Sequence, residues 1–458
     1  MPHTLFARNN RINVPDDFVK IQDAINSSVD GDTILVAPGT YFENINFRGK
    51  NVLLSSYYLF DEDVSFINTT IIDGSNPQLP DTASVVIFLN GENNTAILQG
   101  FTITGGKGTK NFDTDGNFFV RTGGGIIILR SSPTIRHNII AFNESINSAG
   151  VSHQGGGGIS VNHSSAIISN NLIYKNNGND GGGLVLGRNS GTVIRNNIIA
   201  YNTTIPTGIG GGGFFIFGKQ GKIINNTIAF NQSNKRGGIE IQDDATVNLE
   251  NCIIYGNKSG SSNTQIGGSG HFNITNTNIE GGWAGAGNID ENPMFIENTP
   301  LILQDASPCV DKGDTSAANY DWEDQDNPGF ALSPALGTLR NDMGAYGGNQ
   351  YKSMPFSSME ITRIEDENGT TPNKFVLSQN YPNPFNPSTL INYSIPDNSF
   401  VTIKVYDLLG KEVATLVNEE KPFGNYAVEF DGSDLSSGVY FYRMQAGGFS
   451  NIKKFILL

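Results

Sequence analysis

The sequence predicts an all-β protein: a right-handed parallel β-helix with an N-terminal capping helix, followed by a small antiparallel β-sandwich domain. Three observations support this fold class: the composition, a seven-residue motif that recurs along the chain, and a C-terminal stretch of alternating strands. Of 458 residues, 55 are glycine and only 16% are charged, which suits short strands and turns better than long helices. We expect the capped β-helix in residues 1–350, a polar, unpatterned linker in 351–373 and the sandwich in 374–458.

The repeated motif reads NNIIAYN at residues 196–202. It recurs with the same hydrophobic pattern as HNIIAFN (137–143), NNLIYKN (170–176), NNTIAFN (225–231) and NCIIYGN (251–257). Copies separated by 26 to 33 residues indicate a solenoid in which each repeat is one coil. Left-handed hexapeptide helices need about 18 residues per coil, so this spacing favours the right-handed form.

A glycine cluster and an alternating strand precede each motif, as in GGGIIIL (123–129) and GGGFFIF (211–217). Since side chains of a strand alternate between two faces, every second residue faces the interior. The two inward columns are Ile126, Ile159, Leu184, Phe214, Ile239 and Ile128, Val161, Leu186, Ile216, Ile241. A further short strand lies between the cluster strand and the motif, as in residues 190–196, so each coil has three strands. Coils stacked about 4.8 Å apart bury a continuous apolar column.

The first motif position falls at the corner between the second and third strands. It is occupied by His137, Asn170, Asn196, Asn225 and Asn251. An amide both donates and accepts, so stacked copies can bond to one another, and we expect an asparagine ladder here with His137 as its cap. Ligand binding by this row is the alternative interpretation.

Weaker copies extend the solenoid in both directions: IIDG (71–74), VVIFL (85–89), LQGFTITGG (98–106) and NTNIEGG (276–282). Ahead of them, Ile21, Ala24 and Ile25 lie on one side of a predicted short helix. A helix there would cover the open end of the solenoid, whose unpaired backbone would otherwise be exposed.

The C-terminal stretch alternates apolar and polar residues between Pro, Asn and Gly turns, which predicts a small sandwich with its own core. The residues expected in that core are Leu390, Tyr393, Val401, Ile403, Val405, Val428, Val439, Phe441 and Phe449.

Charge and hydropathy exclude two classes of partner. A net charge of −15, carried mostly before residue 368, argues against general nucleic-acid binding. No apolar run reaches the roughly 18 to 20 residues of a membrane span. Cys252 and Cys309 are too few for a disulfide framework and lack metal-ligand spacing.

The segments IQDAINSSVDGDTILVAPGTYFENI (21–45), IIDG and GFTITGG resemble the start of secreted pectin-lyase-like β-helix proteins. GNIDENPMF, ASPCVDKGD and NDMGAYGG (within 287–348) resemble their closing segment. That family contains polysaccharide lyases, glycoside hydrolases, epimerases and non-catalytic surface proteins, so the resemblance implies extracellular polysaccharide as partner more than one reaction.

FVLSQNYPNPFNPSTLINYSIP (375–396), VTIKVYDLLGKEVATLV (401–417) and residues 424–458 are similar to the type A sorting domain of the type IX secretion system. The resemblance implies export to the outer cell surface or the medium, with Lys453 and Lys454 of the terminal KKFILL in the signal that the secretion machinery reads. The segment MPHTLFARNN lacks a basic region followed by an apolar stretch, so we expect a trimmed or mis-started N-terminus.

Unequal loops leave the stack between the third strand and the next coil, the longest lying between Gly106 and Gly123, and they would wall a groove over the first strands. At the corner after those strands, Arg130, His163 and Arg188 occupy successive coils. A uronate lyase needs cations to neutralise the carboxylate and a base for the adjacent carbon-bound proton, and these three residues are our catalytic candidates. A solvated polar corner is the plainer alternative.

Further candidates for substrate binding lie on the outward side of the strands or in loops. Phe215 and Phe217 could stack on sugar rings, and Glu240 and Asp243 are the carboxylates that a hydrolase would need. Lys235, Arg236 and His153 could reach in from loops. The polygalacturonase signatures are absent, so a lyase is favoured over a hydrolase.

No cofactor is required by this interpretation, although the acidic run at Asp321, Glu323, Asp324 and Asp326 could hold Ca²⁺. The net negative charge favours neutral glycans unless a local basic groove or calcium overcomes it. The sequence therefore predicts an exported protein that binds or processes extracellular polysaccharide, with a uronate lyase as one form. The alternative is a non-catalytic solenoid for surface binding or adhesion.

Overall fold

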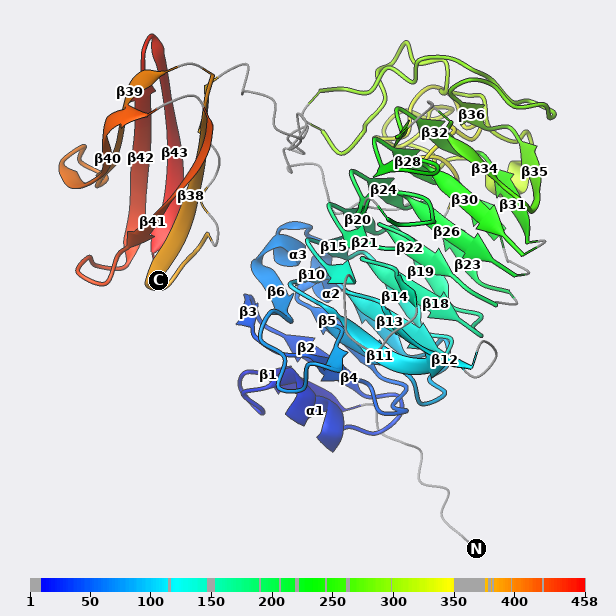
Figure 1. The fold of residues 1–458 in the computed structure, drawn as a ribbon, viewed down its shortest axis with the longest axis horizontal. Helices are drawn as coiled ribbons and strands as arrows, with labels where there is room; N and C mark the ends of the chain where they lie inside the picture. The colour runs from blue at the N-terminus through cyan, green and yellow to red at the C-terminus, as the bar shows by residue number, and fades with distance from the viewer. Residues whose placement is uncertain are drawn as a thin grey trace, which may run out of the picture. The chain divides into compact units, whose positions relative to one another are not determined.

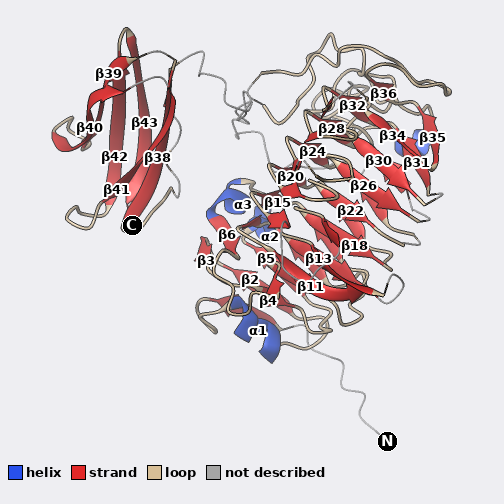
Figure 2. Cartoon of the chain, in the orientation of Figure 1, coloured by secondary structure: helices blue, strands red, loops and turns tan. Residues whose placement is uncertain are grey.

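A computed structural model gives the protein as two compact units, one within residues 10–349 and one within 375–457 (Figure 1). The structure describes residues 10–113, 117–145, 153–188, 191–205, 207–218, 222–243, 245–260, 264–297, 299–349, 375–377, 380, 383–396, 398–421 and 424–457. The predicted linker, 351–373, lies outside the described residues. The first unit is the predicted solenoid of stacked coils, and the second consists of antiparallel strands (Figure 2).

Three parallel sheets run along the solenoid, and each complete coil adds one strand to each of them, the end coils contributing fewer. The first sheet contains β4 (Ile45–Asn46), β8 (Val86–Phe88), β13 (Ile126–Leu129), β18 (Ile159–Asn162), β22 (Leu184–Leu186), β26 (Phe214–Phe217), β30 (Ile239–Gln242) and β34 (Ile266–Gly268). The second sheet contains β1 (Arg11–Val14), β2 (Thr33–Val36), β5 (Leu53–Ser56), β9 (Ile97–Gln99), β14 (Thr134–Arg136), β19 (Ile167–Ser169), β23 (Val193–Arg195), β27 (Lys222–Ile224), β31 (Thr246–Glu250) and β35 (His271–Thr275). The third sheet contains β3 (Gly39–Tyr41), β6 (Thr70–Asp73), β10 (Thr102–Thr104), β15 (Ile139–Ala141), β20 (Leu172–Tyr174), β24 (Ile198–Ala200), β28 (Thr227–Ala229), β32 (Ile253–Tyr255) and β36 (Asn278–Ile279).

The predicted register is confirmed in the first sheet. Ile126 pairs with Ile159, Ile159 with Leu184, and the column continues through Phe214 and Ile239. All five side chains are fully buried. The exposed fraction is at most 1% for the neighbouring column of Ile128, Val161, Leu186, Ile216 and Ile241. These residues fill one continuous core that no single coil could bury.

The glycine clusters are explained by the closeness of neighbouring coils at the corner before the first sheet. A Cβ placed on Gly124 would lie 2.2 Å from the carbonyl oxygen of Gly157, and one on Gly182 would lie 2.5 Å from that of Gly212. No side chain fits at such distances, so only glycine lets successive coils stack here. The corner continues into short strands paired between coils: β16 (Glu144–Ser145), β21 (Asn177–Gly178), β25 (Thr203–Thr204), β29 (Gln232–Ser233) and β33 (Lys258–Ser259).

An asparagine ladder is present, but the predicted row is wrong by one residue. The stacked amides are those of the second motif position, where Asn138 Nδ2 donates to Asn171 Oδ1 at 3.1 Å and Asn171 Nδ2 donates to Asn197 Oδ1 at 3.0 Å. The row continues to Asn226, after which the Cys252 Sγ accepts from the Asn226 N–H at 3.5 Å. A second ladder, which was not predicted, joins the last motif position: Asn143, Asn176, Asn202, Asn231 and Asn257.

The predicted row instead lies at the turn itself, in the left-handed backbone region. His137, Asn170, Asn196, Asn225 and Asn251 have φ between 51° and 55°. Asparagine tolerates this conformation better than most residues, which explains its recurrence there. The residue after the turn has the inward-facing side chain, and that is why the ladder forms one position later.

Three of those turn asparagines bind the segment that closes the unit. The Asn196 side chain donates to the carbonyl of Gly347 at 2.7 Å, and that of Asn225 donates to Asn341 Oδ1 at 2.8 Å. Asn251 Oδ1 accepts from the backbone N–H of Asp314 at 2.8 Å. The closing segment also packs Leu301 and Tyr346 against the outer face of the third sheet.

Helices are few among the described residues: α1 (Ile21–Ser27), α2 (Tyr58–Asp61), α3 (Ser65–Thr69) and the 3₁₀ turn η1 (Ala317–Asn319). The α1 helix lies at the N-terminal end of the stack (Figure 1), where Ile21, Ala24 and Ile25 are fully buried as predicted. The first backbone N–H groups of α1 have no acceptor within the helix. The Glu43 carboxylate, which is distant in sequence, accepts from those of Ile21 and Gln22. No helix in the described part of the chain has the length and hydropathy that a membrane crossing requires.

The second unit has two antiparallel sheets. One contains β37 (Val376–Leu377), β38 (Ser388–Ile395) and β41 (Gly424–Asp431), and the other contains β39 (Ser399–Tyr406), β40 (Glu412–Lys421), β42 (Gly438–Ala446) and β43 (Phe449–Leu457). Tyr393, Val401, Ile403 and Val405 are buried as predicted, and Val428 and Phe449 pack at the edge of the core.

Three predicted core positions in this unit are wrong because the alternation was assigned to the wrong face. Leu390 is 43% exposed, whereas Ile391 is buried. In β42 the buried residues are Tyr440, Tyr442, Met444 and Ala446, with Val439 and Phe441 on the other side. A one-residue slip exchanges the two faces of a strand.

Candidate functional site

The long excursion after Gly106 forms a hairpin that lies over the outward side of the first sheet. Its strands β11 (Gly108–Asp113) and β12 (Phe118–Thr122) pair antiparallel. They belong to a small sheet with β7 (Thr82–Ala83) and β17 (His153–Gly155). The predicted wall over the first strands is therefore a two-stranded element, held by pairing on both sides.

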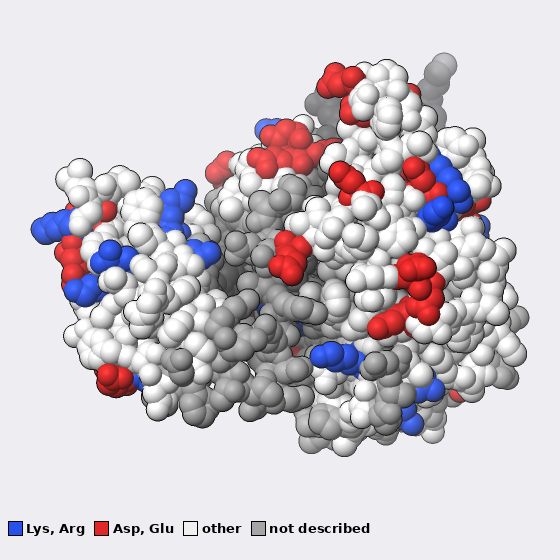
Figure 3. Space-filling view, turned by 90° about the horizontal axis from the view of Figure 1, so that it is seen from above, with Lys and Arg blue, Asp and Glu red and all other residues white. Residues whose placement is uncertain are grey.

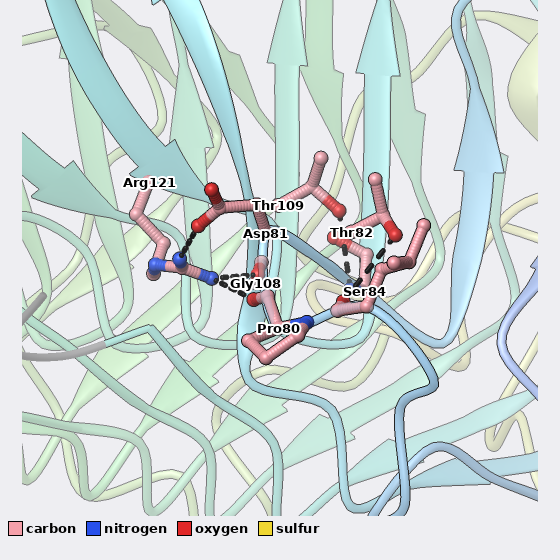
Figure 4. Close-up of polar contacts among 8 residues, drawn as sticks. Pro80, Asp81, Thr82, Ser84, Gly108, Thr109 and Arg121 are labelled. Carbon is pink, nitrogen blue, oxygen red and sulfur yellow. Dashed lines mark hydrogen bonds and ion pairs between the residues drawn. The ribbon is translucent and has the colours of Figure 1, made fainter.

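Arg121 fixes the base of this hairpin. Its Nη1 donates to the carbonyl oxygens of Gly108 at 2.7 Å and Pro80 at 2.8 Å, and its Nη2 donates to Asp81 Oδ1 at 2.7 Å (Figure 4). The Arg121 side chain is only 8% exposed. A planar guanidinium can hold three acceptors in fixed directions, so this contact sets the position of the hairpin over the sheet.

A cleft of about 390 Å³, counting the space open to solvent, lies between the hairpin and the first sheet. The hairpin contributes Asn111, Phe112, Asp113, Val120 and Thr122, and the sheet with its corner contributes Ile127, Ile128, Leu129, Arg130, Ser160, Asn162 and His163. Polar and charged groups come from both sides, over an apolar floor.

Arg130 and His163 occupy equivalent corners of neighbouring coils. Both have left-handed backbones, with φ of 51° and 50°. Leu129 and Asn162, which precede them, are paired in register, and the Arg130 N–H donates to the Asn162 carbonyl at 3.1 Å. The strand register therefore places the two side chains side by side at the cleft, as predicted.

Arg188 continues this corner on the next coil. The His163 N–H donates to the Arg188 carbonyl at 3.0 Å, and Arg188 Nη1 lies 3.8 Å from Asp113 Oδ1. The Asp113 side chain is only 14% exposed, whereas that of Arg188 is 43% exposed. The three catalytic candidates are thus brought together, and Asp113 of the hairpin joins them.

Sequence reasoning missed Asp113, Asn111 and Asn162 as cleft residues. The excursion was recognised as long, but not as a hairpin whose alternate residues face the sheet. The alternation in KNFD was the available signal, since Asn111 and Asp113 would share one face of a strand.

Phe215 and Glu240 lie two to three coils away from His163, on β26 and β30, and they do not line the cleft. They are paired in register and nearly buried, with 6% and 8% exposure. Burial raises the pKa of Glu240, and the positive charge of Arg236 works against that shift; Arg236 Nε lies 3.9 Å from Glu240 Oε2.

Phe217 is half-buried and lies closer to the cleft. A Cβ on Gly187 would lie 2.6 Å from Asn162 Oδ1 and 3.0 Å from the ring of Phe217, so both side chains crowd over Gly187. Phe217 therefore continues the row of side chains that leads away from Asn162.

The remaining loop candidates are spread along the stack. Lys235 is exposed beside Arg236, and Asp243 is exposed at the corner after β30. The backbone of His153 pairs with Val120 of the hairpin, and its side chain lies outside the described part of the structure. The structure does not bring Lys235, Arg236 or Asp243 into the cleft with Arg130 and His163.

The acidic run in the closing segment divides between the interior and the surface. Asp321 is 5% exposed, and its Oδ2 accepts from the Asp342 N–H at 3.2 Å. Burial, reinforced by the charge of Asp342, raises the pKa of Asp321. Glu323 and Asp324 instead accept from nearby backbone N–H groups at the surface, at 2.9 and 3.0 Å. Within the described ranges no three His, Cys, Asp or Glu side chains are arranged to hold a metal ion, and calcium at Asp321, Glu323, Asp324 and Asp326 stays a prediction.

The surface seen in Figure 3 carries separate patches of acidic side chains with fewer basic ones on the β-helix unit. This agrees with the net charge of −15. The cleft differs from that background because Arg130 and His163 line it together with Asp113, and Arg188 lies 3.8 Å from Asp113.

Comparisons with known proteins define the class of each unit. Residues 142–279 match the family model described as the right handed beta helix region, and residues 379–458 match the secretion system C-terminal sorting domain. The protein is a right-handed parallel β-helix protein with a type IX sorting domain. It is exported to the cell surface or the extracellular space.

Two solved structures are similar to this chain at a low level. A pectin methylesterase mutant in complex with hexasaccharide IV shares 11% identity, with a TM-score of 0.25, over 62% of this chain and 93% of its own. A pectin methylesterase in complex with hexasaccharide VII shares 11% identity, with a TM-score of 0.23, over 59% and 77%. Scores this low say nothing about the activity of the present chain. No curated protein matches it in sequence.

Proposed function

We propose that the cleft binds a uronate unit of an extracellular polysaccharide and cleaves the chain there by β-elimination. The observation that supports this most directly is that Arg130 and His163 line a cleft roofed by the hairpin, with Arg188 of the next coil 3.8 Å from the cleft residue Asp113. Two guanidinium groups suit a carboxylate, and a neutral imidazole is a suitable base near neutral pH.

In this reaction each residue has a separate task. The arginines neutralise the sugar carboxylate and so stabilise the negative charge that develops when the neighbouring C–H bond breaks. His163 takes that proton, the C–H electrons form a carbon–carbon double bond, and the glycosidic C–O bond breaks. The leaving oxygen takes a proton from solvent, and Asp113 orients Arg188.

The negative charge of the protein affects how a polyanionic substrate would bind. The acidic background repels a polyanion at long range, so binding depends on the local cations of the cleft. We expect binding to be short-ranged and to weaken with added salt. No cofactor is needed for this reaction; calcium at the acidic run of the closing segment would be a separate, structural proposal.

The test is the formation of unsaturated uronate products, followed by ultraviolet absorbance, from polygalacturonate and alginate. We expect His163→Ala and Arg188→Ala each to lower the rate by at least about 100-fold, the usual contribution of a general base and of an electrostatic stabiliser, respectively. Asp243→Ala, at an exposed corner on another coil, serves as the matched control. Unchanged rates in both cleft variants would refute the proposed site.

A non-catalytic binding protein is the second candidate, and one observation favours it. Arg188 is already paired with Asp113, so part of the positive charge is engaged before any ligand arrives. Binding of both glycans without unsaturated products, lost on Arg130→Ala, would support this second candidate over the lyase.

We also propose that Lys453 and Lys454 form part of the signal that the secretion machinery reads. Both lie in β43, at the edge of its sheet, where Lys453 is half-buried and Lys454 is exposed. Changing both to alanine should leave the sandwich folded and increase the amount of protein retained in the cell, measured by immunoblotting of cell and medium fractions. Unaltered export would remove the lysines from the signal.

A further inference from the structure

An exposed aromatic pair stands at the rim of the cleft, on the hairpin. Phe112 and Phe119 are 43% and 47% exposed, they pair directly across β11 and β12, and their ring centroids lie 5.2 Å apart at 68°. Phe112 itself lines the cleft, between Asn111 and Asp113. The two rings contact each other and form one small exposed apolar surface beside the cleft.

Packing within the protein does not account for the two exposed rings. Neither ring belongs to a buried apolar cluster of the described residues. The alternate residues Asn111, Val120 and Thr122 face the first sheet, so the hairpin already has a packed side without the two rings.

The pair is also held rigidly. The clamp of Arg121 and the pairing of β12 with β17 fix the strands that present the rings. Lys110 Nζ lies 4.9 Å from the centre of the Phe119 ring, so a cation covers one face of that ring and stands beside Phe112. A preorganised aromatic surface beside a polar cleft loses little entropy on binding.

We propose that Phe112 and Phe119 form a stacking platform for a pyranose ring, two or more units along the chain from the uronate bound at Arg130 and Arg188. The apolar C–H face of a sugar packs on an aromatic ring, and Lys110 can meet a hydroxyl or carboxylate at its edge. Stacking on sugar rings was expected of Phe215 and Phe217, but Phe215 is buried in the fold. This inference rests on the proposed function of the cleft.

The test compares short and long ligands, because only a long one reaches both the cleft and the platform. Binding of galacturonate disaccharide and hexasaccharide is measured by calorimetry in a His163→Ala background, which prevents turnover. We expect Phe112→Ser with Phe119→Ser to weaken hexasaccharide binding about tenfold more than disaccharide binding. Phe330→Ser, 50% exposed in the closing segment, is the matched control and should change neither.

The outcomes separate the platform from the cleft. Unchanged hexasaccharide binding in the double variant, together with loss of binding in Arg130→Ala, would overturn the platform and keep the proposed function. Equal weakening for both ligands would show that the rings only support the hairpin, which also overturns the platform. A parent protein that binds neither ligand would overturn the proposed function and the platform with it.

Discussion

At the scale of single residues, the asparagine ladder shows how position decides between two kinds of asparagine. Asn171 is fully buried, and its Nδ2 donates to the carbonyls of Ile135 and Ser169 and to Asn197 Oδ1. We expect Asn171→Ala to lower the free energy of unfolding by roughly 3 to 5 kcal/mol, because several buried polar groups lose their partners at once. Chemical denaturation of the β-helix unit measures this change.

Asn248→Ala is the matched control. Its side chain accepts from Asn273 at 3.0 Å on the exposed side of the second sheet, where water replaces the lost bond. We expect a change below about 1 kcal/mol there. A similar loss in both variants would mean that stacking, not burial, determines the contribution.

The sequence identified the corner and the residue type of this ladder but placed it one residue early. A repeated Asn-Asn pair contains one turn residue and one inward residue, and the motif alone does not distinguish them. The positive φ of Asn170 and Asn196 and the burial of Asn171 and Asn197 assign the two roles. The same one-residue ambiguity explains why Leu390 and Phe441 were assigned to the wrong side of their strands.

At the scale of elements, the hairpin β11–β12 depends on the Arg121 clamp. We expect Arg121→Ala to release the base of the hairpin and to raise amide hydrogen exchange in residues 108–113 and 118–122 by at least about tenfold, since opening there would no longer break three hydrogen bonds. Mass spectrometry of peptic fragments provides the measurement.

Asp81→Asn gives a graded comparison, because both carbonyl contacts of Arg121 remain. We expect a smaller rise in exchange in this variant, since Asp81 is 68% exposed and contributes a solvent-screened partner. Exchange unaffected by Arg121→Ala would show that strand pairing with β7 and β17 alone holds the hairpin.

Elements built from the repeat were predictable, and the excursion was not. The sequence located the first strands because glycine clusters and alternation recur at known offsets. The hairpin occurs once, so no second copy revealed its register, and Asp113 was overlooked although Arg130, His163 and Arg188 were found. The positions of side chains on the solenoid can be predicted from the repeat, whereas those on insertions are known only from the three-dimensional structure.

At the scale of the whole molecule, buried carboxyl groups make stability depend on pH. Asp180 is 6% exposed, and burial raises its pKa to about 7, while burial also raises the pKa of Asp342. The folded chain therefore holds these protons more tightly than the unfolded chain, in which a carboxyl has a pKa near about 4. Stability is fully present at low pH and decreases as the pH rises from about 4 to about 7.

For Asp180 alone the loss across that window is on the order of 4 kcal/mol. Thermal unfolding measured at several pH values should show it as a falling melting temperature. Asp180→Asn, which removes the titration, should flatten the slope, and Asp243→Asn, an exposed substitution, should not. A melting temperature that rises across the same window would contradict the assignment.

The modular stacking has a consequence for how such a chain can change in length. Excising residues 197–225 would join Asn196 directly to Asn226 and so preserve an intact motif at the junction. Asn196 would then stand where Asn225 now holds the closing segment, and Asn170 would stand where Asn196 does. The result would be a shorter protein with the same ends and an unaltered cleft. Gain or loss of entire coils would therefore change the length of this protein without changing its cleft.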